Sequence, residues 1–83
     1  MNYALKPNAL RNLKKLPRSI QKRILDKLDF YVRSDNPLTF AESLRDEVLG
    51  EFRFRIGDYR VAFDLVDNLI VVLKIGHRRD FYK

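Results

Sequence analysis

An alternation of apolar and polar residues on both sides of a Gly-Asp pair most restricts how this 83-residue chain can fold. The segment FRFRIGDYRVAF runs from Phe52 to Phe63, and a glycine in the first of two turn positions is typical of a type II′ hairpin. We therefore predict two antiparallel strands joined by Gly57-Asp58, with the apolar side chains facing a core.

The polar side chains of this hairpin are almost entirely arginines. A two-residue turn predicts the pairs Ile56–Tyr59, Arg55–Arg60, Phe54–Val61 and Arg53–Ala62. Like charges directly opposite each other, at a Cβ separation of roughly 5 Å, are destabilising. Guanidiniums on rigid strands offer planar forks of donors that match phosphate oxygens and stay charged near neutrality. The hairpin therefore predicts a phosphodiester site. A solvated basic face with an acidic neutraliser such as Asp64 is the alternative interpretation.

A strand and two helices are predicted before the hairpin. NYALK, at residues 2–6, alternates like a short strand, and residues 8–34 favour an αα-hairpin. We expect Asn8 to cap the first helix and Pro17 to occupy the first position of the second. In residues 35–50, apolar side chains recur every four residues, at Phe40, Leu44 and Val48, which favours a short helical turn. We expect the sheet to begin near Gly50.

The segment LIVVLKI predicts a third strand that lies inside the sheet, because it is apolar at nearly every position. A two-residue loop before it would place Lys74 on the apolar face, whereas a three-residue loop, 67–69, places it beside Ala62 on the arginine side. Because an amine costs more to bury than to expose, we predict the longer loop, with Leu73 and Ile75 inward. Two helices followed by an antiparallel meander predict an α+β fold with the helices on one face of the sheet.

The amino-acid composition limits the classes of function that this chain can have. The chain has no cysteine and one histidine, so disulfides, thiolate metal sites and His-rich metal sites are excluded, and we expect no metal or cofactor. No run approaches about 18 apolar residues, and no signal-peptide core begins the chain, so we expect one domain over residues 1–83, cytoplasmic and without a membrane partner. A net charge of +6 suits a nucleic-acid partner as well as simple solubility.

The tail GHRRDFY adds chemistry to the arginines. His77 is the side chain that exchanges protons near pH 7 without help. Tyr82 could donate or accept a proton, or stack on a base. Each has a plainer interpretation, as a turn histidine and as an aromatic packed on the sheet. A basic sheet face followed by His-Arg-Arg and an aromatic favours a functional site.

The segment LKKLP before a basic helix, then RFRIGDYRVAF, an apolar strand and GHRRDFY, together resemble the RelE toxins of the RelE/ParE superfamily. The resemblance covers essentially the whole chain. It implies two N-terminal helices on a small, twisted, mostly antiparallel sheet. It also implies a toxin that cleaves messenger RNA in the ribosomal A site without metal, by attack of the 2′-hydroxyl, leaving a 2′,3′-cyclic phosphate and a 5′-hydroxyl. The implied partners are the ribosome, mRNA and a short, acidic, co-encoded antitoxin, with operator DNA bound only through the antitoxin complex.

The same resemblance implies a catalytic set of Arg53, Arg55, Arg60, Arg78 and Tyr82. In well-known members the pair before the turn is lysine, and one lysine is a candidate general base. Arginine cannot serve, because its pKa lies so high that it stays protonated near neutrality. His77 or Tyr82 is left to accept the proton, unless the ribosome orients the nucleophile. Other basic residues are assigned to RNA binding: Arg11, Lys14, Lys15, Arg18, Lys22 and Arg23 on the helices, and Lys74 and Arg79 near the hairpin.

Two other functions stay open. ParE-like relatives share the fold but poison DNA gyrase, and they generally lack the arginine and tyrosine set. A non-catalytic module that binds an antitoxin and regulates its operator is the second alternative. The presence of the whole set favours the nuclease.

Overall fold

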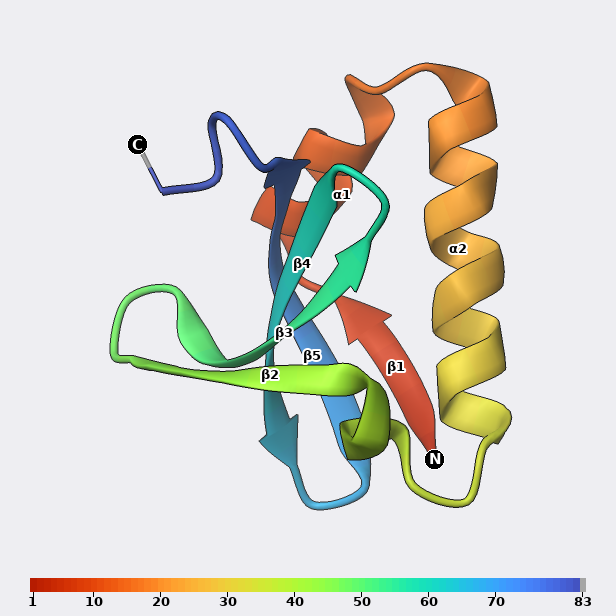
Figure 1. Cartoon of the computed structure of the whole chain (residues 1–83), viewed down its shortest axis with the longest axis vertical. Coiled ribbons are helices and arrows are strands. Elements are labelled where there is room, and N and C mark those ends of the chain that lie inside the picture. The colour runs from red at the N-terminus through yellow and green to blue at the C-terminus, as the bar shows by residue number, and fades with distance from the viewer. Residues whose placement is uncertain (83) are drawn as a thin grey trace.

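The structure is a computed structural model that describes residues 1–82 as two helices, a 3₁₀ turn and a five-stranded sheet (Figure 1). In chain order the elements are β1 (Asn2–Leu5), α1 (Pro7–Lys14), α2 (Arg18–Arg33), the 3₁₀ helix η1 (Pro37–Phe40), β2 (Ala41–Asp46), β3 (Gly50–Ile56), β4 (Tyr59–Val66) and β5 (Leu69–His77). The strand order is β1-β5-β4-β3-β2, in which β1 pairs parallel with β5 and the other neighbours are antiparallel. The predicted α+β fold is confirmed.

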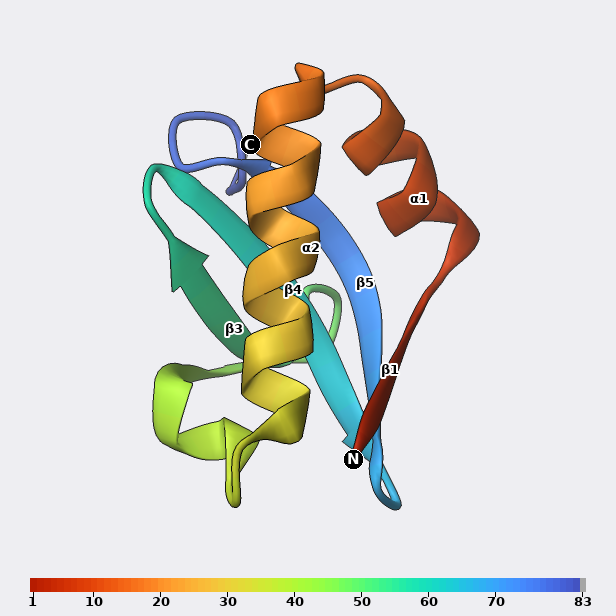
Figure 2. The same ribbon diagram turned by 90° about the vertical axis from the view of Figure 1, so that its right-hand side faces the viewer.

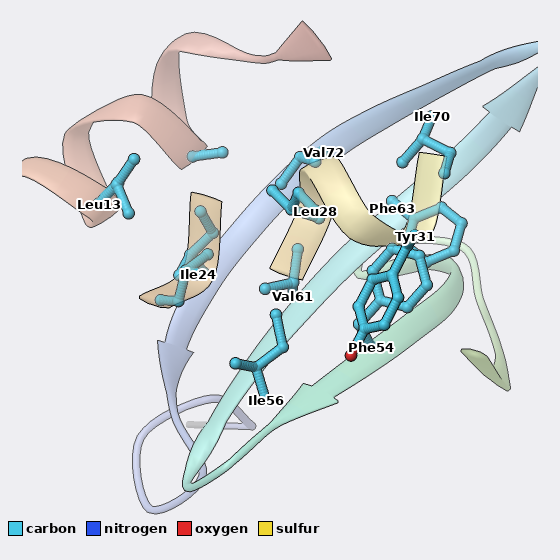
Figure 3. Packing of buried hydrophobic residues seen from close by; sticks show 12 residues of the cluster. Leu13, Ile24, Leu28, Tyr31, Phe54, Ile56, Val61, Phe63, Ile70 and Val72 are labelled. Carbon is cyan, nitrogen blue, oxygen red and sulfur yellow. The ribbon is translucent and has the colours of Figure 1, made fainter. Parts of the chain in front are cut away.

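Both helices lie on one face of the sheet (Figure 2). The predicted apolar stripe of α2 supplies three buried residues, Ile24, Leu28 and Tyr31. They face inward residues of β3, β4 and β5, and the Tyr31 and Phe54 rings lie 4.4 Å apart (Figure 3). Each such side chain stabilises the fold by about 1.5–3 kcal/mol relative to exposure, so α2 is held by packing rather than by caps.

The hairpin of β3 and β4 has the predicted register, with the pairs Phe54–Val61, Arg55–Arg60 and Ile56–Tyr59. Gly57 has φ 59°, a left-handed conformation that favours glycine at the first position of a type II′ turn. A Cβ on Gly57 would lie 2.9 Å from a guanidinium nitrogen of Arg23 on α2. Glycine is therefore needed both for the turn and for the approach of Arg23.

The turn between β4 and β5 corrects the sequence prediction. Val66 pairs with Leu69, so the loop has two residues rather than three, and Asp67 adopts φ 56° in it. A register shift between Ala62 and Phe63 nevertheless brings Lys74 opposite Ala62, as predicted. The bulge, rather than a longer loop, therefore places Lys74 on the arginine side of the sheet.

Two asparagines of α1 satisfy the peptide groups around this bulge. The Asn12 side chain accepts a hydrogen bond from the Ile75 N–H at 3.0 Å, and the Asn8 amide donates to the Leu73 carbonyl at 3.1 Å. Leu73 stays half-buried outside the main core, contrary to prediction, whereas Ile75 is buried as expected. A bulge leaves peptide groups unpaired, and side chains one helical turn apart can reach both ends of it.

The other corrections concern caps and the segment before β3. Asn8 is not the cap of α1, because Lys6 precedes a helix that starts at Pro7. Pro17 is the cap residue of α2 rather than its first helical residue. The helical turn expected within 35–50 is limited to η1, and strand β2 follows it. Pairing with β3 outweighs the four-residue apolar spacing there, and Val48 is 87% exposed.

Candidate anion-binding site

The sheet face away from the helices carries the arginine face, which we define as Arg53, Arg55, Arg60 and Lys74. Side chains alternate along a strand, so Phe54 and Val61 point to the helices while their neighbours point away. The pairs Arg53–Ala62, Arg55–Arg60 and Ala62–Lys74 place all four cations on three adjacent strands. In Figure 1 the C-terminal tail lies on this side of the sheet, opposite α2.

Glu42 on β2 neutralises two of the four cations. Its register partner is Arg53, whose Nη2 lies 2.9 Å from Glu42 Oε2, and Arg55 Nη1 lies 3.3 Å from Oε1. The hydrogen bond from Arg53, with further attraction from both guanidiniums, lowers the pKa of Glu42. The Nε of Arg53 is buried and has no hydrogen-bond partner within the described chain. Sequence reasoning missed Glu42, because β2 was not predicted as a strand.

Arg60 is in a different environment from its neighbours. It is only 8% exposed, and its Nη1 donates to the carbonyls of Gly57 and Tyr59, each at 3.0 Å. Among residues 1–82 it forms no ion pair. Burial, and then repulsion from Arg55 and other arginines, lowers the pKa of Arg60. Burial of a cation that has no ion-pair partner costs free energy, which makes Arg60 a candidate contact for an anion.

The tail folds back over the arginine face. Phe81 is fully buried beside Gly76, where a Cβ would lie 3.8 Å from its ring. The Lys74 ammonium lies 5.2 Å from the centroid of the Phe81 ring and donates to the Phe81 carbonyl. Tyr82 is 54% exposed, and the Arg53 guanidinium carbon lies 5.6 Å from its ring centroid. The structure therefore brings Tyr82 to the predicted site, through an anchor at Phe81 that the sequence did not single out.

Arg78 also reaches the hairpin end of this site. Its backbone N–H donates to the Asp58 carbonyl at 2.7 Å, and its Nε lies 3.8 Å from a carboxylate oxygen of Asp58. Arg23 approaches the same turn from α2, through Gly57. The two-residue turn is thus surrounded by guanidiniums from α2, from β4 and from the tail.

His77 lies apart from the arginine face. It pairs with Tyr59 at the end of β5, and the two rings meet edge to face at 5.3 Å. Tyr59 shares the helix side of β4 with Val61, so His77 points to that side too. Its Nδ1 accepts a hydrogen bond from the Arg79 N–H at 3.1 Å, which assigns the proton of the neutral ring to Nε2. Arg79 itself is exposed next to it.

The remaining basic residues form a separate, exposed helix surface: Arg11, Lys14, Lys15, Arg18 and Lys22. Lys22 forms an i,i+4 ion pair with Asp26 at 2.7 Å. This surface lies on the helical layer rather than on the arginine face. The sequence correctly placed these helix residues on the surface, but it did not indicate that Arg60 of the arginine face is buried or that the sheet separates the two groups.

Among the described residues, no group of three or more His, Cys, Asp or Glu side chains could hold a metal ion. No helix in residues 1–82 is both long enough and apolar enough to cross a membrane.

Comparison with known proteins identifies the class. Residues 3–82 match the family of ParE toxins of the parDE type II toxin–antitoxin system. Toxin RelG of Mycobacterium tuberculosis is 35% identical over 77 residues, which cover 90% of this chain and 87% of that protein. The crystal structure of the toxin–antitoxin complex RelBE2 of the same organism matches with a TM-score of 0.77 and 32% identity, covering 93% of this chain and 96% of that one.

Two more distant structures show the same fold. The RelB–RelE complex of Methanococcus jannaschii matches with a TM-score of 0.72 and 20% identity, covering 94% of this chain and 93% of that one. The intact RelBE complex of E. coli matches with a TM-score of 0.69 and 18% identity, covering 90% and 93%. The fold and these relatives define a type II toxin. The chain belongs to the ParE toxin family, and it is a RelE-type toxin of the RelE/ParE superfamily.

Proposed function

We propose that this toxin is an endoribonuclease that cleaves messenger RNA on the ribosome without a metal ion. The observation that carries the proposal is Arg60, a buried guanidinium without a carboxylate partner among residues 1–82. The unpaired Nε of Arg53 is a second donor on the same face. A phosphodiester supplies the anion and the acceptor that these two groups lack.

In the proposed reaction the ribose 2′-oxygen attacks the adjacent phosphorus while the phenolate form of Tyr82 accepts its proton. The bond from phosphorus to the 5′-oxygen breaks, and that oxygen takes up a proton. The products are a 2′,3′-cyclic phosphate and a 5′-hydroxyl. Negative charge develops on the phosphoryl oxygens in the transition state, and the fixed guanidiniums of Arg53, Arg60 and Arg78 stabilise it there. Arg55 adds to the positive electrostatic potential around the bound phosphate.

Tyr82 is favoured over His77 as the proton acceptor for a geometric reason. Tyr82 lies beside Arg53 on the arginine face, whereas His77 lies against Tyr59 on the other side of the sheet. The Nδ1 of His77 already accepts the Arg79 N–H, so it has no free acceptor in the neutral ring. His77 then acts by positioning the tail.

The partners follow from the same proposal. The structural relatives are toxin–antitoxin complexes, which supports a cognate antitoxin for this chain. We propose that the antitoxin is short, acidic and co-encoded, that operator DNA is bound only through its complex, and that residues 1–83 act as one cytoplasmic domain. The exposed helix surface, together with Arg23 and Arg79, would contact ribosomal RNA through phosphate neutralisation.

The test is toeprinting of translating ribosomes, combined with analysis of the new RNA ends. Wild-type toxin should produce codon-spaced cuts that leave a 5′-hydroxyl, and these cuts should appear only when translating ribosomes are present. Arg60→Ala should reduce cleavage by about 10²-fold or more, the usual effect of losing one preorganised donor. Cleavage by purified Arg60→Ala at the wild-type rate would remove the main support for the proposal.

DNA gyrase is a second candidate target, because the matching family is that of ParE toxins. A supercoiling assay with purified gyrase separates the two. The nuclease proposal expects message cleavage with no effect on supercoiling, and the opposite result would assign this chain to the gyrase poisons.

A further inference from the structure

Glu42 occupies the arginine face as an anion would. One carboxylate, on the edge strand β2, places one oxygen 2.9 Å from Arg53 Nη2 and the other 3.3 Å from Arg55 Nη1. Two oxygens on two guanidiniums reproduce how the free oxygens of a phosphodiester are bound. Two of the arginines at the proposed site, Arg53 and Arg55, therefore already have a carboxylate partner in the free protein.

The contact is strong enough to occupy the site and weak enough to be displaced. The side chains of Glu42 and Arg55 are 42% and 60% exposed, so their pairing is screened by water. The bond to Arg53, whose side chain is 24% exposed, is the better shielded of the two. Meanwhile Arg60 keeps no carboxylate partner within residues 1–82 and stays ready for an incoming ligand.

We propose that Glu42 competes with incoming anions for Arg53 and Arg55, so that a single anion binds too weakly to replace it, whereas an RNA strand replaces it through additional contacts. When a lone phosphate ion binds, it only takes the place of the Glu42 carboxylate on the two arginines, so little binding free energy is gained. A strand offers successive phosphates, so contacts at Arg60 and Arg78 offset the loss of the Glu42 pair. The identity of the ligand as RNA rests on the proposed function, whereas the competition between Glu42 and an anion does not.

The direction of the effect separates this role from simple charge balance. If Glu42 only orders Arg53 and Arg55, its loss lets the two guanidiniums move apart and weakens anion binding. If Glu42 competes with the ligand, its loss strengthens binding. The matched control is Glu47, an exposed glutamate in the turn after β2 that forms no hydrogen bond or ion pair within the described chain. Glu42→Gln and Glu47→Gln raise the net charge equally, from +6 to +7.

The probe is a fluorescent, fully 2′-O-methylated RNA of about ten nucleotides, which binds like a single strand but carries no attacking hydroxyl. Binding is measured by anisotropy at several salt concentrations. Glu42→Gln should bind the probe about fivefold more tightly than Glu47→Gln, the scale of two exposed ion pairs. Glu42→Thr, a good strand former, should do the same. In a second arm, phosphate competition titrations, each corrected for that variant's own probe affinity, should give a phosphate dissociation constant about fivefold lower for Glu42→Gln than for Glu47→Gln.

Equal probe affinity of Glu42→Gln and Glu47→Gln, or weaker binding by both Glu42 variants while thermal unfolding shows them folded, would overturn the proposal. Cleavage by the wild-type toxin is measured separately on ribosomes. No cleavage together with tighter binding by Glu42→Gln rejects the proposed function but keeps the competition. Cleavage together with equal affinities keeps the function and rejects the role of Glu42.

Discussion

Arg55 and Arg60 are direct cross-strand partners, yet the guanidinium of Arg55 binds a carboxylate and that of Arg60 binds backbone carbonyls. Arg55 extends to Glu42 on the neighbouring strand, and its side chain is 60% exposed. Arg60 turns back to the carbonyls of the hairpin turn and is buried. Arg55 thus has a carboxylate partner that offsets the repulsion expected from the register, whereas Arg60 forms no ion pair within residues 1–82. Because of that asymmetry, the proposed function depends on Arg60 more than on Arg55.

The first prediction concerns Arg60→Met, which keeps most of the side-chain volume and removes the charge. It eliminates a desolvated cation and its repulsion from Arg55, but it also removes two hydrogen bonds to backbone carbonyls. We expect the free energy of unfolding to hold or to rise by up to about 1 kcal/mol. Cleavage should fall by about 10²-fold or more.

Urea unfolding and primer extension on ribosomes measure the two effects. Arg33→Met, at the far end of α2, is the control for removing an arginine, and it should leave cleavage unchanged. A large loss of stability in Arg60→Met would mean that the guanidinium holds the turn together rather than waiting for an anion.

The second prediction separates the two candidate proton acceptors. Tyr82→Phe keeps the ring beside Arg53 and removes the hydroxyl, so it should reduce cleavage by about 10²-fold, the lower end for loss of acid–base catalysis. His77→Gln keeps a hydrogen-bonding side chain at the end of β5 and should reduce cleavage by less than about 10-fold. Single-turnover cleavage on stalled ribosomes, followed across pH, is the measurement. A larger loss in His77→Gln than in Tyr82→Phe would reverse the assignment.

Much of the fold could be predicted because local patterns agreed with packing. The hairpin register followed from one two-residue turn, and the stripe of α2 followed from helical spacing. Strand β2 was missed, since Phe40, Leu44 and Val48 imitate a helix, and only pairing with β3 decides the conformation. With β2 missing, Glu42 could not be placed beside Arg53.

The tail shows a second limit of sequence reasoning. Its basic and aromatic residues were recognised, but the sequence did not indicate that Phe81 is buried or that His77 falls on the opposite side of the sheet. The side on which each residue lies depends on the bulge in β5. That bulge depends on asparagines of α1 that are more than 60 residues away in the chain, at separations of 65 and 63. No local pattern carries such information.

The third prediction is a loss of stability in acid that involves two carboxylates. Hydrogen bonding from Arg53, and then attraction to it and Arg55, lowers the pKa of Glu42 below its ordinary 4.5. Hydrogen bonds from the backbone of Leu49 and Val48 lower the pKa of Asp46 below its ordinary 3.8. The unfolded chain therefore binds protons more readily than the folded chain, so stability rises with pH across this window.

The contribution of the two groups should be complete above their ordinary pKa values of 4.5 and 3.8, and it should disappear as pH falls through the lowered values of the folded protein. Thermal midpoints measured between pH 6 and pH 3 test this. The double variant Glu42→Gln with Asp46→Asn should lose less of its midpoint over that range than the wild type. Parallel curves for the two proteins would show that neither carboxylate is coupled to folding.

The fourth prediction concerns Asn12, which reaches from α1 to the bulge of β5. Asn12→Ala leaves the N–H of the buried Ile75 without its acceptor, and an unsatisfied buried donor costs about 1–3 kcal/mol of stability. Asn12→Asp keeps an acceptor oxygen and should recover most of that loss. Because the bulge places Lys74 on the arginine face, Asn12→Ala should also loosen the tail.

Amide hydrogen exchange measures this second effect at Asp80 and Phe81, whose N–H groups donate to the His77 carbonyl at 2.9 and 3.0 Å. Exchange at both amides should accelerate in Asn12→Ala. It should also accelerate in Lys74→Met, which removes the hydrogen bond to the Phe81 carbonyl without changing α1.

The two variants should differ in global stability, because only Asn12→Ala leaves an unsatisfied donor in the core. Since Tyr82 follows Phe81, both variants should lower the cleavage rate, and the loss should grow with the exchange rate measured in the tail. Unchanged exchange in Asn12→Ala, despite lower stability, would show that the bulge and the tail are independent.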